Sequence, residues 1–354
     1  MKLKISSKLS IVTAVFVCAP FAQAQYQTQN NNYGVSGGNV NDISKAFCCS
    51  GTLGSLVTAG GMQYILSNNH VLARQDQASP GEDISQPGLI DNGCQVPRIV
   101  ADFTAAPQLG TNVDCAIAQL RAGTMNTGGA IQGLNGSNTG VQPSTTVAAP
   151  SVGMAVQKSG RTTGHTTGTI GSTNTSVKVQ YQIQCGKGKK YTISYTNQVL
   201  INGSGFSAGG DSGSLILTNT SCAHPVALLF AGSSSSTIGN SISDVLNALS
   251  GVVGSPVNFV GQSCTGPSSP QSGPQSFQLP QQALDHAGRV LEQNRHDLMS
   301  RPEVLGVGLG ALEDNSAPAI VVYVDKTSQA KPQLPAQADN VPVRIIMIDS
   351  FIAF

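Results

Sequence analysis

The stretch Gly209-Gly210-Asp211-Ser212-Gly213-Ser214, followed directly by the apolar run Leu215-Ile216-Leu217, decides how the rest of the chain is interpreted. A serine between glycines just before a strand can expose its hydroxyl while neighbouring backbone N–H groups converge on one point. A nucleophile and an oxyanion hole both need this arrangement. The alternative is a flexible Gly/Ser turn, because the chain has 40 glycines. A base and an orienting acid elsewhere in the chain would decide between the two.

The composition favours many short strands. Gly, Ser, Thr, Asn and Val are abundant, and charged residues make up only 10% of the 354 residues, with a formal net charge of +1. No basic stripe could follow a phosphate backbone, so no nucleic acid partner is expected. The prediction is an all-β chain long enough for two or three compact units.

The first 24 residues have the pattern of a secretory signal peptide. Lys2, Lys4 and Lys8 precede an apolar segment, residues 11–21, and Ala22-Gln23-Ala24 is a small-residue cleavage site. About eleven apolar residues are too few to span a bilayer, and no other run is longer. The mature chain is therefore expected to have no membrane anchor and to be secreted or periplasmic.

Seven cysteines remain after Cys18 of the signal peptide is removed. In an oxidising compartment they predict up to three disulfide bonds and one odd thiol, with the pairing left open. Their spacing does not resemble a Cys/His ligand set, so neither a metal site nor a cofactor is expected. The seven are Cys48, Cys49, Cys94, Cys115, Cys185, Cys222 and Cys264.

The chain divides into four parts after the signal peptide. Residues 25–45 are rich in Gln, Asn and Gly and are expected to be a flexible leader or a short propeptide. Residues 46–260 contain about a dozen short apolar runs, which predict paired barrels or a sandwich. Residues 261–280 form a Pro/Ser/Gln linker. Residues 281–354 predict a small α+β module, with a helix over residues 281–299 and three strands.

Few side chains could serve as the base and the acid. Only five histidines are present, and His70 lies at the end of an apolar strand, facing a turn. Asp114 begins the apolar stretch that continues to Leu120, where an unpaired charge would be costly. Asp102 is the competitor, but its segment leads into a loop. Strand alternation places Cys115 toward the core, so Cys115 is the predicted free thiol.

The order His70, Asp114, Ser212 resembles that of the chymotrypsin-like serine peptidases, in particular their bacterial, α-lytic-protease-like members. The stretch Lys158-Ser159-Gly160-Arg161-Thr162-Thr163-Gly164 resembles the start of that family's second barrel, and Leu229-Phe230-Ala231-Gly232 its substrate-binding strand. The resemblance covers roughly residues 46–255. It implies two six-stranded antiparallel β-barrels.

The resemblance also implies a mechanism of peptide hydrolysis. Ser212 would be the nucleophile, His70 the base and Asp114 its partner, with the oxyanion held by the N–H groups of Gly210 and Ser212. Val71 stands where the family often has a cysteine, so the usual disulfide around the histidine is not expected. No activation motif is recognisable, and the sequence assigns no ammonium partner to Asp211.

The substrate pocket implied by the resemblance contains no acidic residue. This pattern predicts a small or apolar side chain before the cleaved bond of a protein or peptide substrate. The pocket residues are Phe206, Ser207, Ala208, Phe230 and Gly232.

The C-terminal module carries no comparable set of residues. The glycines of residues 302–310 alternate along a strand and no helix follows, so a nucleotide loop is not favoured. The module resembles small α+β modules of bacterial trypsin-like proteins, and a regulatory, folding or docking role is expected. The alternative for the whole chain is a catalytically inactive protease fold used for binding or adhesion.

Overall fold

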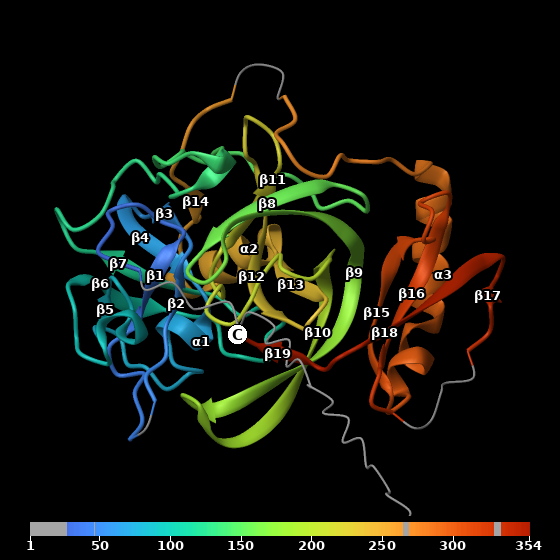
Figure 1. Ribbon diagram of the computed structural model, residues 1–354, viewed down its shortest axis with the longest axis horizontal. Coiled ribbons are helices and arrows are strands. Elements are labelled where there is room, and N and C mark those ends of the chain that lie inside the picture. The colour runs from blue at the N-terminus through green and yellow to red at the C-terminus, as the bar shows by residue number, and fades with distance from the viewer. Residues whose placement is uncertain (1–26, 46, 265–268, 329–333) are drawn as a thin grey trace, which may run out of the picture.

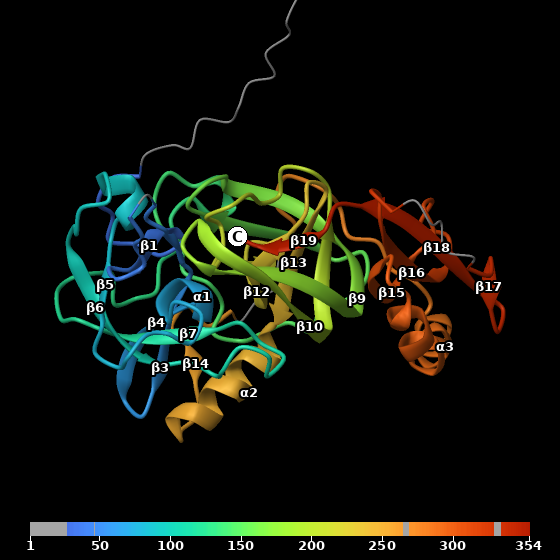
Figure 2. The same ribbon diagram turned by 90° about the horizontal axis from the view of Figure 1, so that it is seen from below.

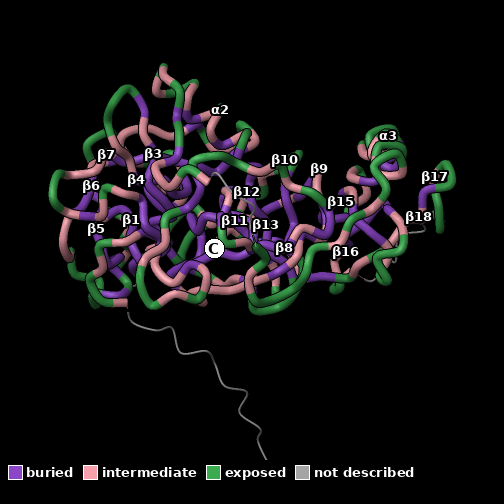
Figure 3. The backbone as a smooth tube through the Cα atoms, turned by 90° about the horizontal axis from the view of Figure 1, so that it is seen from above, coloured by how far each residue is buried: buried purple, intermediate pink, exposed green. Residues whose placement is uncertain are grey.

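The computed structural model describes residues 27–45, 47–264, 269–328 and 334–354. The predicted signal peptide, residues 1–24, lies outside the described residues. The described chain is mostly β, as predicted, with two sheets side by side (Figure 1). Most strand residues are buried, and most exposed residues lie in the connecting loops (Figure 3).

The first sheet has eight strands in the order β14-β3-β4-β7-β6-β5-β1-β2. Its strands are β1 (Val35–Asn39), β2 (Gly51–Leu53), β3 (Ser55–Ala59), β4 (Met62–Ser67), β5 (Asp83–Ser85), β6 (Ile99–Ala105), β7 (Ala116–Leu120) and β14 (Asn258–Phe259). Between its elements lie α1 (Asn69–Leu72) and two 3-10 turns, Leu89–Asn92 and Leu134–Gly136.

The second sheet has eleven strands, and six of them, β8 to β13, form a closed ring through the pairing of β9 with β10. The ring strands are β8 (Ala155–Gly160), β9 (Gly164–Gln184), β10 (Lys187–Asn202), β11 (Leu215–Thr218), β12 (Pro225–Gly232) and β13 (Ser236–Ser241). Helix α2 (Ile242–Val253) follows the ring and buries Ile242, Val245 and Leu249 in an apolar core to which both sheets contribute.

The prediction of two six-stranded barrels is borne out in part. The first sheet is a half-barrel in which only Gly54 separates β2 from β3, and β14 is added beside β3. One edge of β2 also contacts the second sheet, because the N–H of Thr52 donates to the carbonyl oxygen of Ser212 at 2.7 Å. Two residues later the N–H of Gly54 donates to the carbonyl oxygen of Leu66 in β4 at 2.9 Å.

The described part of the expected leader, residues 27–45, contains strand β1. Strand β1 pairs with β2 and β5, and Tyr33 and Val35 are buried. Amide side chains supply further hydrogen bonds, such as that from Gln27 Nε2 to the carbonyl oxygen of Arg161 at 2.8 Å. A low apolar content was a poor guide here, because strand pairing needs backbone groups and only a few inward side chains.

The C-terminal segment contains the predicted helix, α3 (Gln281–Ser300), and a set of strands that extend the second sheet. Ala287, Val290, Leu291 and Leu298 share the buried face of α3. Strand β15 pairs with the long strand β9, so the sheet of the module is continuous with the ring (Figure 2). The added strands are β15 (Val304–Ala311), β16 (Pro318–Asp325), β17 (Gln337–Ala338), β18 (Val341–Ile348) and β19 (Phe351–Ala353).

Three disulfide bonds are formed, and Cys115 is free and buried, as predicted. Burial and the nearby charge of Asp114 raise the pKa of the Cys115 thiol well above its ordinary value. The pairs are Cys48–Cys94, Cys49–Cys185 and Cys222–Cys264. Among the described residues, no helix is long and apolar enough to cross a membrane.

Candidate active site

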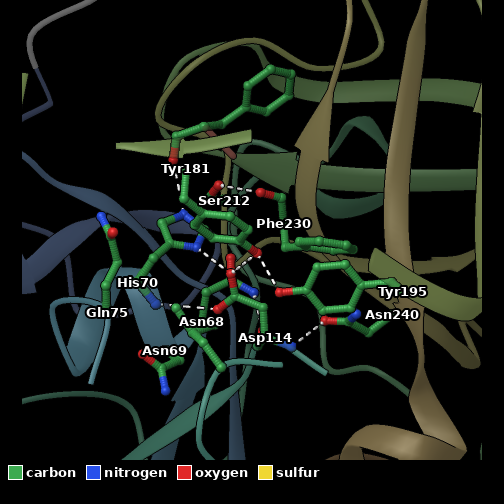
Figure 4. Close-up of polar contacts among 12 residues, drawn as sticks. Asn68, Asn69, His70, Gln75, Asp114, Tyr181, Tyr195, Ser212, Phe230 and Asn240 are labelled. Carbon is green, nitrogen blue, oxygen red and sulfur yellow. Dashed lines mark hydrogen bonds and ion pairs between the residues drawn. The ribbon is translucent and has the colours of Figure 1, made fainter. Parts of the chain in front are cut away.

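His70 and Asp114 meet at the junction of the two sheets. His70 lies in the short helix α1 after β4, and Asp114 directly precedes the neighbouring strand β7. The ring Nδ1 of His70 is 2.6 Å from Asp114 Oδ2, and the backbone N–H of His70 donates to Oδ1 at 3.2 Å (Figure 4). Both oxygens of Asp114 thus fix the histidine, one through its ring and one through its backbone. The competitor Asp102 instead pairs with Arg121 on the surface.

Asp114 is fully buried and its surroundings are polar. The hydroxyl of Tyr181 donates to Oδ2 at 2.9 Å, and Tyr195 lies behind it with its hydroxyl 2.7 Å from that of Tyr181 (Figure 4). The side chains of Asn68 and Asn240 hold the Asp114 backbone, at 2.6 and 2.9 Å. A buried carboxylate needs such donors to remain ionised. Burial raises the pKa of Tyr181 well above its ordinary value, so Tyr181 is a permanent donor.

The pKa of His70 is raised above its ordinary value of 6.5. Burial is the largest influence and lowers the pKa, but the charge of Asp114 and its hydrogen bond to the ring outweigh it. The carbonyl oxygen of Phe354 and the charge of Asp42 raise it further. The site therefore stabilises the imidazolium, the form that a general base takes after it accepts a proton.

The loop that carries Ser212 is shaped to expose backbone donors. Gly210 has φ +96°, and a Cβ there would lie 2.6 Å from Thr162 Oγ1, so this position requires glycine. The carbonyl oxygen of Gly210 accepts from Thr52 Oγ1 at 3.0 Å, which turns it away from the cleft. Among the described residues, nothing accepts a hydrogen bond from the N–H of Gly210 or of Ser212. Two unused donors beside a serine hydroxyl are what an oxyanion hole requires.

Asp211, next to Ser212, is the second buried aspartate of the site. Lys158 Nζ lies 3.4 Å from Asp211 Oδ2, and both side chains are fully buried. The carboxylate also accepts from the N–H groups of Thr162 and Ala208, at 2.8 and 3.0 Å, and from Thr163 Oγ1 at 2.7 Å. Burial lowers the pKa of Lys158, and the charge of Asp211 opposes this effect. The ammonium partner that the sequence left open is thus Lys158 from strand β8.

A second buried ion pair, Arg161–Asp91, supports the loop that carries Ser212. The guanidinium of Arg161 binds both oxygens of Asp91, at 2.7 and 2.8 Å. The backbone N–H of Arg161 donates to Thr52 Oγ1 at 3.0 Å, and Thr52 in turn holds Gly210. This bidentate pair fixes the turn that donates to Asp211.

The hydroxyl of Ser212 does not bond to His70 within the described part of the chain. It lies 3.2 Å from the carbonyl oxygen of Phe230, while His70 Nε2 lies 2.9 Å from the carbonyl oxygen of Phe354 (Figure 4 shows the Ser212 contact). The structure therefore brings His70 and Asp114 into contact, and it places Ser212 beside them with its expected partner nitrogen engaged elsewhere.

The predicted pocket residues lie around the end of β12. Phe206 is buried in an apolar cluster that Phe354 also contacts, and Gly232 faces the Phe354 ring. Ser207 Oγ is 2.5 Å from Thr237 Oγ1, and the N–H of Ala208 donates to Asp211 Oδ2. Phe230 differs from the expectation, because strand alternation gives the cleft its carbonyl oxygen while its ring packs on Tyr195, with centroids 5.0 Å apart.

Similarity to known proteins was found among solved structures. No family model matches the chain, and no curated protein matches it in sequence. Among solved structures, a glutamic acid specific serine protease has 24% identity and a TM-score of 0.45, covering 64% of this chain and 98% of its own. Protease A of Thermobifida fusca has 19% identity and a TM-score of 0.43, covering 66% and 99%. The Nocardiopsis protease has 14% and 0.45, covering 65% and 98%.

The matched structures are bacterial chymotrypsin-like and α-lytic-type serine proteases. At these identities the similarity concerns the fold, so the chemistry is argued from the residues of this chain.

Three residues at the site were missed by sequence reasoning. Lys158 carried a usable signal, because it lies two residues after Val156 in one strand. The two side chains therefore share a face, and Val156 is buried. Tyr181 and Phe354 carried none, since both belong to segments whose position depends on the long strand β9 and the strands added to it.

Proposed function

We propose that the chain is an exported serine endopeptidase in which His70, Asp114 and Ser212 are the catalytic triad. The observation that carries this proposal is the 2.6 Å contact of a buried aspartate with the His70 ring, beside a serine loop with two unused N–H donors. A structural histidine has no need of a neighbouring serine or of free donors. No metal or cofactor takes part in this scheme.

The proposed reaction follows from the positions of these groups. Ser212 Oγ attacks the carbonyl carbon of a peptide, and its proton passes to His70 Nε2. The oxyanion that forms accepts hydrogen bonds from the N–H groups of Gly210 and Ser212. His70 then gives the proton to the leaving amine, the C–N bond breaks, and water hydrolyses the acyl-enzyme by the same route. Asp114 stabilises the imidazolium throughout.

A fluorophosphonate probe tests the proposal directly, since it reacts only with an activated serine. We expect the intact protein to be labelled and Ser212→Ala to be unlabelled and inactive on casein. Ser204→Ala, at an exposed serine of the nearby loop, is the matched control and should be labelled as the unsubstituted protein is. Labelling that persists in Ser212→Ala would end the assignment. Absence of labelling in every protein would favour the alternative of a catalytically inactive binding or adhesion protein.

The disulfide bonds support the proposal that the protein is exported. Three disulfide bonds join distant parts of the chain, and one of them, Cys49–Cys185, links segments 136 residues apart. Such bonds persist in secreted and periplasmic proteins. Together with the signal peptide predicted for residues 1–24, they support secretion or export to a periplasm.

A further inference from the structure

Strand β19 lies along the edge of the proposed substrate-binding strand. It pairs antiparallel with β12, with Ala353 opposite Ala231 and Ile352 opposite Gly232. The pairing continues to the site, because the N–H of Phe354 donates to the carbonyl oxygen of Phe230 at 3.3 Å. Figure 2 shows β19 running from the module toward the centre of the molecule. An extended peptide added to a free strand edge is a general mode of peptide recognition.

The ring of Phe354 fills the proposed pocket. A Cβ at Gly232 would lie 2.5 Å from Phe354 Cζ and 2.9 Å from Cε2, so the absence of a side chain at Gly232 makes the room for this ring. Phe354 packs on the apolar cluster that contains Phe206, Leu229 and Ile201. The cavity is thus both wide enough and apolar enough for an aromatic side chain.

The backbone of Phe354 engages the catalytic histidine. Its carbonyl oxygen lies 2.9 Å from His70 Nε2, the nitrogen that must accept the proton of Ser212. Ala353 and Phe354 also line, with His70 and Tyr181, a cavity of about 140 Å³ beside the site. A substrate would need the edge of β12, the pocket and Nε2, and the segment occupies all three.

The C-terminal module holds this segment in place. Asp349, just before β19, binds Lys326 at 2.8 Å and the hydroxyl of Ser234 in the loop after β12. On the far side, Arg295 of α3 donates to Ser176 Oγ of β9 at 2.7 Å. Phe351 is fully buried and contacts Tyr323 edge-on at 6.2 Å. A segment that is anchored next to its binding site has a high effective concentration at that site.

We propose that residues Phe351–Phe354 are an intramolecular inhibitor that occupies the substrate cleft, and that the pocket at Gly232 accepts an aromatic side chain on the acyl side of the cleaved bond. This inference rests on the proposed peptidase function and adds to it the regulation of the site and the class of its substrate.

The test compares the full chain with a chain that ends at Ile352. This shortening removes only Ala353 and Phe354 and keeps the buried Phe351 in place. We expect the shortened protein to react with the fluorophosphonate, and to hydrolyse a peptide with Phe before the scissile bond, at least about tenfold faster than the full chain. Phe354→Ala in the full chain should give an increase in the same direction. Ile345→Ala is the matched control, because Ile345 lies in β18 outside the segment and its side chain is 45% exposed, and it should leave the rates unchanged.

A peptide added in trans separates the inhibitor from any effect of shortening on folding. The heptapeptide Ile348–Phe354 should inhibit the shortened protein competitively, and the same peptide with alanine in place of Phe354 should inhibit at least about tenfold more weakly. Equal rates for the full and shortened chains, together with no inhibition by the heptapeptide, would overturn the inhibitory role.

The substrate class is tested with peptides that differ only in the residue before the scissile bond. We expect kcat/KM to be highest with Phe and at least about tenfold lower with Ala, Glu or Arg. Preference for Glu or Arg would overturn the aromatic assignment while leaving the peptidase function intact. The peptidase function itself fails if neither the full nor the shortened chain is labelled or cleaves any of the peptides, so the two failures can be told apart.

Discussion

Asp114 and Asp211 are two aspartates of one site that are equally buried and have different partners. Asp114 faces the His70 ring, a group that gains and loses a proton near neutral pH, and it is supported by the hydroxyl of Tyr181. Asp211 faces the ammonium of Lys158 and accepts from backbone N–H groups of its own loop and of the adjoining turn. Asp114 thus hydrogen-bonds to a ring whose charge changes during the proposed reaction. Asp211 is paired with groups whose charge does not change in that reaction.

This difference separates chemistry from architecture. A carboxylate beside imidazole can stabilise a charge that develops during a reaction, so its loss should lower kcat. A carboxylate paired with a fixed cation shapes a loop. Loss of that cation leaves a buried charge unpaired, so it should lower the free energy of unfolding. Substitutions at the two positions can therefore show whether the roles are distinct.

The largest expected effect is on catalysis in Asp114→Asn. The amide keeps the shape of the side chain but cannot stabilise the imidazolium and favours the wrong ring tautomer, so kcat should fall by about 10⁴-fold. Hydrolysis of a Phe-containing peptide and the rate of fluorophosphonate labelling measure the loss. Asp102→Asn is the matched control, since Asp102 is a partly exposed neighbour in sequence that pairs with Arg121, and it should lower the rate by less than about twofold. A comparable loss in both variants would argue against the assigned role of Asp114.

The next effect is on stability in Lys158→Met. Methionine fills a similar volume but leaves the Asp211 carboxylate without its cation, which should lower the free energy of unfolding by about 3–5 kcal/mol. Urea denaturation followed by circular dichroism measures it.

Two further variants control the Lys158 experiment. Arg121→Met removes an arginine that is 40% exposed and pairs with Asp83 and Asp102, and it should cost at most about 1 kcal/mol. The double variant Lys158→Met/Asp211→Asn should recover part of the lost stability, because neither side chain of the pair then carries a charge. If Lys158→Met unfolds at the same urea concentration as the unsubstituted protein, the pair does not support the loop.

The same contrast explains what the sequence could and could not predict. His70, Asp114 and Ser212 are short-range signals: each is a polar residue next to an apolar run, and their order along the chain links them. Lys158 could have been found, because its strand alternation turns it inward, but nothing in the sequence pairs it with Asp211. Tyr181 reaches Asp114 only because β9 is 21 residues long and bends from the ring to the other sheet.

Two further features have a common physical cause. Composition predicts residues 27–45 and residues 281–354 as units apart from the barrels, since it shows whether a segment can form its own core. Composition does not show which strand edges are free to receive it. Strand β1 completes the first sheet, β15 extends β9, and β19 lies on β12, so in each case the missing information was an edge in another part of the chain.

The smallest expected effect is a shift in the titration of His70. Its ring faces the carboxylates of Asp114 and Asp42, the edge of Tyr181 and the carbonyl oxygen of Phe354. Because the pKa of His70 is above 6.5 in the folded chain, its stabilising contribution is complete below pH 6.5 and is lost as the pH rises through the folded pKa. Hydrolysis has the opposite dependence, since the base must be neutral, and should increase as the pH rises through that same pKa.

Phe354 should make this titration depend on the length of the chain. Its carbonyl oxygen raises the pKa of His70, so by linkage protonation of His70 must tighten the hold on the C-terminal segment. The chain that ends at Ile352 should therefore titrate at a lower pH than the full chain, and the difference in peptidase rate between the two should shrink as the pH rises. Histidine-ring NMR and pH–rate profiles measure both. Asp42→Asn is the control, because burial raises the pKa of Asp42 to about 6 and its own titration falls in the same window. If both lengths titrate at one pH with Asp42 removed, Phe354 does not engage the protonated ring, and inhibition would have to come from occupation of the pocket and the β12 edge alone.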